Sequence, residues 1–92
     1  MKRKELAEKF VDALKRQIEE KSFFADGVET ALESEKILIN IAEELGEASS
    51  DFLRGRMYGA VSECVDIAHS AMLLAISLDK DGEVLNRHYK GL

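Results

Sequence analysis

The chain has 92 residues and a mass of 10.3 kDa, which is the size of one small domain and excludes a multidomain protein. Hydrophobic residues make up 46% of the chain and charged residues 34%, whereas aromatic residues make up only 7% and Pro and Trp are absent. This composition favours an all-α domain over a strand-rich one. The 18 acidic residues outnumber the 13 basic ones, and the net charge of -5 disfavours binding to polymeric nucleic acid, because like charges repel.

Helical periodicity predicts four helices in one domain, residues 1–92. In the first, Leu6, Phe10 and Leu14 recur every four residues and form an apolar stripe. Glycine-containing segments that favour turns separate the later helices. The predicted helices are residues 2–21, 28–53, 57–78 and 83–90. We therefore expect a bundle of three long helices and a short fourth.

The third predicted helix is unusually apolar. An average charged fraction of 34% would give its 22 residues about seven charged side chains, but it has two, Glu63 and Asp66. Its apolar part, residues 64–78, is shorter than the ~20 residues that span a membrane and contains Asp66 and His69. We therefore expect a core helix and no membrane span. One chain of this size covers such a helix poorly, so we expect a homodimer or homotetramer.

A cytoplasmic location is expected from two features of the sequence. Cys64 is the single cysteine and cannot form an internal disulfide, and its apolar neighbours predict a buried thiol. The first residues are followed by charged Glu5 and Glu8 and not by the apolar run of a signal peptide.

Glu63 and Asp66 are three residues apart and therefore share one face of the third predicted helix. Two like charges on an apolar helix are unfavourable unless something compensates them. The second predicted helix is also acidic, since residues 26–51 hold eight acids and one Lys. Glu44 and Glu47 lie on its polar stripe, and an isolated pair of this kind is usually a solvated face. If the two helices pack together, the four carboxylates meet, and a hard divalent cation would compensate them.

The two acidic groups also form a motif. They read Glu43-Glu44-Leu45-Gly46-Glu47 and, after fifteen residues, Glu63-Cys64-Val65-Asp66. This pattern resembles the E-E-x-x-E … E-x-x-D signature of the MazG-like all-α nucleoside triphosphate pyrophosphohydrolases, over roughly residues 36–78. Dimeric dUTPases and phosphoribosyl-ATP pyrophosphohydrolases share it, so the resemblance does not select a substrate.

The resemblance implies cleavage of a nucleoside triphosphate, ribo- or deoxyribo-, between its α and β phosphates, which gives a monophosphate and pyrophosphate. It implies that Mg²⁺, with Mn²⁺ as the alternative ion, is bound by Glu44, Glu47, Glu63 and Asp66. Glu43 would position water, and the acids implied in catalysis are Glu43, Glu44 and Glu47. Which carboxylate accepts the proton of water is left open.

Basic and amide side chains are expected to complete a phosphate site. Lys36 lies one turn before Asn40 on the polar stripe of the second predicted helix. The resemblance also points to an Asn and a basic residue after the third helix. The candidate substrate-binding residues are Lys36, Asn40, Lys80, Asn86 and Arg87.

Two other interpretations are weighed beside the enzyme. The first is a non-catalytic helical dimerisation or interaction module in which the four acids form a vestigial or structural metal site. The second is a redox carboxylate-bridged metal protein, suggested by Asp66 and His69 three residues apart, but such sites need a second motif of this kind. A buried histidine at the edge of the core is the favoured interpretation of His69.

Overall fold

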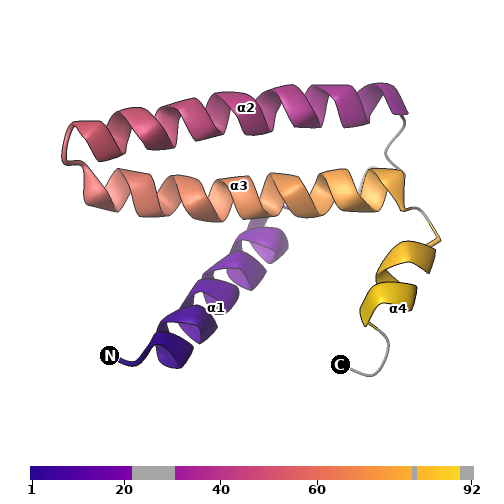
Figure 1. The fold of residues 1–92 in the computed structure, drawn as a ribbon, viewed down its shortest axis with the longest axis horizontal. Coiled ribbons are helices and arrows are strands. Elements are labelled where there is room, and N and C mark those ends of the chain that lie inside the picture. Colours follow the sequence, from indigo (N-terminus) through magenta and orange to yellow (C-terminus); the bar gives the residue numbers. More distant parts are fainter. Residues whose placement is uncertain (22–30, 80, 90–92) are drawn as a thin grey trace.

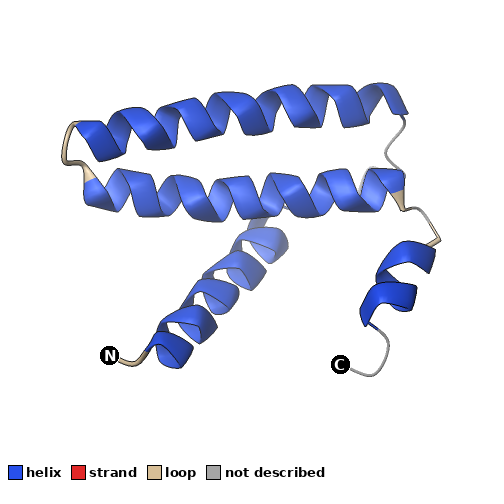
Figure 2. Ribbon diagram, viewed as in Figure 1, coloured by secondary structure: helices blue, strands red, loops and turns tan. Residues whose placement is uncertain are grey.

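The computed structural model describes residues 1–21, 31–79 and 81–89, and within these ranges helices are joined by short connections, without a strand (Figure 2). Its four helices are α1 (Arg3–Lys21), α2 (Ala31–Leu53), α3 (Met57–Leu78) and α4 (Glu83–Tyr89). The all-α class and the number and order of the helices are therefore as predicted. The predicted extensions of α2 over residues 28–30 and of α4 to Lys90 lie outside the described residues.

The helices α2 and α3 lie side by side and antiparallel, and form the body of the molecule (Figure 1). The helix α1 packs on α3 at an angle, so that α3 is the central element, and α4 follows at the end of α3. The stripe of α1 that contains Phe10, Leu14 and Ile18 is half-buried. The apolar stripe of α1 thus packs against α3.

A tight connection joins α2 to α3. Gly55 has a φ of 74°, a left-handed conformation that glycine adopts without strain, and Arg56 N donates to Asp51 O at 2.8 Å. Gly59, in the first turn of α3, lies against α2 so closely that a Cβ atom there would be 2.6 Å from Asp51 Oδ2. A larger residue at this position would displace the carboxylate of Asp51, so Gly59 leaves room for this side chain between the helices.

The interior of the single chain is small and largely polar. Among the described residues, Leu73 is the one buried large hydrophobic residue, and the buried polar residues are Ser34, His69, Ser70 and Ser77. Ser34 Oγ and Ser77 Oγ are 2.6 Å apart and join α2 to α3. The radius of gyration is 14.8 Å, whereas a compact domain of this length has ~12 Å. The four helices therefore form an open arrangement.

The apolar side chains lie mostly on the outside, which corrects the expectation that the third helix is buried. One 18-residue stretch of α3 is long and apolar enough to cross a membrane, yet only 17% of it is buried in the chain. The reason is geometric, because α2 and α1 cover α3 only in part, so that many of its residues are half-buried and others, such as Tyr58 and Val61, are exposed. The buried core helix of a soluble protein can be equally long and apolar. Length and composition therefore do not by themselves identify a membrane protein.

One apolar groove on the outside lies between α2 and α3, close to their connection, and has a volume of about 430 Å³. Cys64 is exposed there, so the prediction of a buried thiol is wrong for the single chain. The apolar residues around Cys64 in the groove, such as Phe52 and Leu53, are themselves exposed, and they form what we call the outer face of the α2–α3 pair together with Val61. The groove residues are Ala48, Ser49, Phe52, Leu53, Ala60 and Cys64.

Candidate metal centre

Three carboxylates meet at the middle of the α2–α3 pair. Glu44 comes from α2, and Glu63 and Asp66 come from neighbouring turns of α3. One oxygen of each lies within 4.8 Å of the others, and all three residues are half-buried. The spacing of three residues puts the two acids of α3 on one face, and the antiparallel packing brings Glu44 opposite them. The sequence prediction that acids of the two helices come together is confirmed for these three residues.

The electrostatic effect of this arrangement is strongest at Glu63. Its pKa is raised above the ordinary value, first because the carboxylate is desolvated and then because of the negative charges of Glu47, Asp66, Glu44 and Asp51. These four acids therefore act on Glu63 from both helices. The ionised form of Glu63 is disfavoured here, and a nearby cation would restore it.

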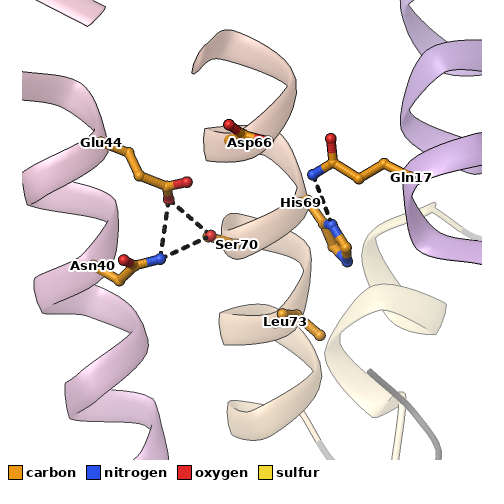
Figure 3. Close-up of a pocket in the computed structure, with 7 residues that line it drawn as sticks. All are labelled: Gln17, Asn40, Glu44, Asp66, His69, Ser70 and Leu73. Carbon is orange, nitrogen blue, oxygen red and sulfur yellow. Dashed lines mark hydrogen bonds between the residues drawn. The ribbon is translucent and has the colours of Figure 1, made fainter. Parts of the chain in front are cut away.

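Two hydrogen bonds hold the carboxylate of Glu44 (Figure 3). Ser70 Oγ on α3 donates to Glu44 Oε1 at 2.8 Å. Asn40 Nδ2, one turn earlier on α2, donates to the same oxygen at 3.2 Å and also lies 3.4 Å from Ser70 Oγ. Glu44 is thus fixed by groups from both helices before any ligand binds.

A small polar pocket of about 80 Å³ lies next to the carboxylates, between α1, α2 and α3 (Figure 3). Gln17 of α1 reaches it and donates from Nε2 to His69 Nδ1 at 2.9 Å. His69 is only 2% exposed, which confirms the prediction of a buried histidine. This volume accommodates two or three water molecules, at ~30 Å³ each. The lining residues are Gln17, Asn40, Glu44, Asp66, His69, Ser70 and Leu73.

The donor set fits a hard divalent cation. Carboxylate oxygens are the ligands that Mg²⁺ and Mn²⁺ prefer, and those of Glu44, Glu63 and Asp66 already lie close together. Mg²⁺ usually keeps several of its waters and takes few protein ligands, which suits a half-buried group of three carboxylates.

The two other predicted acids, Glu43 and Glu47, belong to α2, as does Asp51. Glu47, one turn after Glu44, is exposed and outside the group of three, although its charge contributes to the raised pKa of Glu63. Glu43 is exposed on α2. Asp51 is two turns from Glu44 and lies 3.9 Å from Arg56 Nη1. The structure thus brings together three of the four predicted ligands and places Glu47 beside them.

The predicted substrate-binding residues are dispersed. Asn40 lines the pocket, and Lys36 is exposed one turn before it on α2. Asn86 and Arg87 are exposed on α4, where Arg87 Nη2 forms an ion pair of 2.7 Å with Glu83 Oε1. Lys80 lies outside the described residues. Of this group, the structure therefore places Asn40 at the carboxylates.

Two pocket residues were not assigned a role from the sequence. Ser70 lies four residues after Asp66 on the same stripe, so helical periodicity was a sufficient signal for its position. Gln17 is 52 residues from its partner His69, and no local pattern relates the two. Its place in the pocket depends on how α1 crosses α3.

Comparison of the chain with known protein families, with curated proteins and with solved structures found no match. The features that bear on function are therefore the residues of the chain and the geometry of the three carboxylates.

Proposed function

We propose that the protein is a Mg²⁺-dependent nucleoside triphosphate pyrophosphohydrolase that acts in the cytoplasm and clears nucleotides from the pool. Mn²⁺ is the alternative ion. The observation that carries the proposal is the group formed by Glu44, Glu63 and Asp66, whose oxygens lie within 4.8 Å of one another. The resemblance of residues 36–78 to the MazG-like signature supports the reaction, because these three residues belong to that signature.

In this proposal Glu44, Glu63 and Asp66 hold the cation. When bound, the cation supplies charge neutralisation for the phosphate oxygens and lowers the pKa of a water. Glu47, whose charge acts on Glu63, and Glu43 are exposed on α2, and either carboxylate would be the one that accepts a proton from water. Lys36 would approach the phosphates from α2, and the candidates on α4 would have to approach from the end of α3.

The direct test is incubation of the purified protein with Mg²⁺ and a panel of ribo- and deoxyribonucleoside triphosphates. We expect monophosphate and pyrophosphate as products, separated by anion exchange. Glu44→Gln should abolish turnover, whereas Glu35→Gln, at an exposed acid of the same helix, should not change it. Absence of turnover with every triphosphate would contradict the proposal and favour the second candidate below.

A second candidate is a non-catalytic helical dimerisation module with a structural or vestigial metal site. The outer face favours it, since large apolar side chains are exposed on both α2 and α3, among them Phe52, Leu53 and Val61. Both candidates require that a second copy of the chain covers this apolar surface.

We propose a homodimer or homotetramer in which a second copy covers the groove that contains Cys64, with no membrane involved.

Sedimentation at micromolar concentration tests the assembly. We expect a species of two or four times the 10.3 kDa chain mass. A monomer in solution would contradict the proposal, and partition of the protein into lipid vesicles would show that a membrane covers the outer face. Assembly without turnover would distinguish the interaction module from the enzyme.

A further inference from the structure

The hydroxyl of Ser70 occupies a special position next to the carboxylates. Ser70 is only 8% exposed, and its Oγ donates to Glu44 Oε1 at 2.8 Å. Asn40 Nδ2 donates to the same oxygen at 3.2 Å and lies 3.4 Å from Ser70 Oγ. A serine hydroxyl has a single proton to donate, and Ser70 gives it to Glu44.

These contacts make the two oxygens of Glu44 unequal. A carboxylate oxygen has about two lone-pair sites, and Oε1 uses both to accept from Ser70 and Asn40. The second oxygen, Oε2, faces α3 (Figure 3). The hydrogen bonds therefore keep Oε1 away from metal coordination and fix the rotation of the carboxylate.

We infer that Ser70 is a positioning residue for metal binding, which acts by holding Glu44 Oε1 so that Oε2 is the ligand atom. Asn40 assists in the same role, which differs from the substrate contact expected from the sequence. The inference rests on the metal site of the proposed function. It does not require that the cation be used for catalysis.

Groups that orient metal ligands typically contribute a factor of ~10 to 100 in affinity when they are removed. Because the Ser70 contact is shorter and more buried than that of Asn40, its loss should have the larger effect. We expect Ser70→Ala to weaken binding by about tenfold, and Asn40→Ala by a smaller factor.

The chain provides a matched control in Ser77. This serine lies on the same stripe of α3, two turns after Ser70, and is 3% exposed. Its hydroxyl contacts Ser34 Oγ at 2.6 Å and donates to Leu74 O at 2.8 Å, away from the three carboxylates. Ser77→Ala therefore also removes a buried hydroxyl between the same two helices, without changing the support of Glu44.

The experiment is a titration with Mn²⁺ followed by electron paramagnetic resonance of the free ion. It uses the wild type, Ser70→Ala, Ser77→Ala and Asn40→Ala, with circular dichroism to verify folding. Weaker binding in Ser70→Ala, with Ser77→Ala equal to the wild type, is the expected result. Ser70→Thr, which keeps a hydroxyl, should retain most of the affinity.

Equal affinities of Ser70→Ala and the wild type would overturn the inference while leaving the metal site intact. Equal weakening in Ser70→Ala and Ser77→Ala would overturn it too, because the effect would then come from general loosening of the helix pair. If Ser70→Ala does not fold, unchanged affinity in Asn40→Ala, an exposed position, would count against the two-donor arrangement. No binding of Mn²⁺ by the wild type would instead refute the proposed function itself.

Discussion

The inner and outer faces of the α2–α3 pair have opposite chemistry. Around the candidate metal centre, the side chains that meet between the helices are carboxylates and hydroxyls, such as those of Glu63, Asp66 and Ser70. On the outside are large apolar residues such as Phe52, which is 63% exposed, and Val61, which is 62% exposed. An amphipathic pair in a soluble single-chain protein is usually arranged the other way round.

This difference shows that folding of a single chain leaves many of its large apolar side chains in contact with water. The inner face gains little from burying acids, because desolvation and repulsion raise the pKa of Glu63. The outer face keeps apolar area in contact with water, which costs free energy of about 25 cal/mol per Å². A cation on the inside and a second copy on the outside would each convert an unfavourable feature into a favourable one.

The largest expected effect concerns the inner face. If the proposed function holds, Glu63→Gln and Asp66→Asn should each reduce turnover by more than about 100-fold, since each removes a proposed metal ligand. The apo protein should nevertheless be equally or more stable in both variants. Because the pKa of Glu63 is raised in the folded state, its ionised form opposes folding at neutral pH, and this penalty decreases as the pH falls through the raised pKa.

Thermal unfolding in the presence of EDTA measures the stability of these variants, and the product assay measures their turnover. Glu19→Gln, at an exposed acid of α1, is the control. If Glu63→Gln and Asp66→Asn instead fail to fold, the two acids stabilise the fold. The interpretation that the carboxylates of the inner face are unfavourable for folding would then be wrong.

The outer face is tested by Phe52→Asp. A charge in the centre of an apolar interface should cost 2 kcal/mol or more of association, or about 30-fold in the dissociation constant. The rate at which a maleimide reagent modifies Cys64, in the same groove, should rise as the assembly dissociates. Val11→Asp, at an exposed apolar residue of α1, is the matched control. Unchanged sedimentation of Phe52→Asp would place the interface elsewhere.

Mg²⁺ should stabilise the folded protein by binding at the carboxylates of the inner face, with no effect on the apolar outer face. A ligand at ten times its dissociation constant stabilises the folded state by about 1.4 kcal/mol. For a domain of this size this corresponds to a rise in Tm of roughly 6 to 11 °C. Differential scanning fluorimetry measures the shift, and Glu44→Gln should abolish it. An equal shift in the wild type and in Glu44→Gln would mean that Mg²⁺ binds elsewhere.

Local sequence patterns were sufficient for the helices and for part of the site. The periodicity of apolar residues predicts α1 and α3 to within a residue at each end, because propensity and amphipathicity agree there. The three-residue spacing of Glu63 and Asp66 predicts their common face. These features depend on neighbours along the chain, which the sequence displays directly.

The remaining features depend on contacts between distant segments. That Glu44, and not Glu47, joins Glu63 and Asp66 follows from the register of the helix pair, which depends on contacts along both helices. The exposure of Cys64 follows from which side of α3 is left uncovered. Periodicity identifies an apolar face of a helix but not the element that covers this face. For this reason the sequence did not predict that Cys64 is exposed.

The smallest expected effect concerns Asp79, at the start of α4, which belongs to neither face of the α2–α3 pair. The carboxylate of Asp79 accepts hydrogen bonds from the backbone N–H groups of Leu85 and Val84, each at 3.0 Å. These bonds lower the pKa of Asp79, the one from Leu85 contributing most. The ionised form therefore stabilises the start of α4 above about pH 3.9, and this contribution is lost as the pH falls through the lowered pKa.

Asp79→Ala should remove both hydrogen bonds and make amide hydrogen exchange of Val84 and Leu85 faster at neutral pH. Acidification of the wild type through the lowered pKa should reduce the protection of the same amides, measured as their exchange rate relative to the intrinsic rate at each pH. The Tm of the α2–α3 pair should stay the same, because α4 is not among the elements that pack extensively on it. A fall in Tm as large as that caused by disrupting the outer face would show that α4 unfolds together with the pair. The contrast between the inner and outer faces would then have to include α4 as part of the covering of α3.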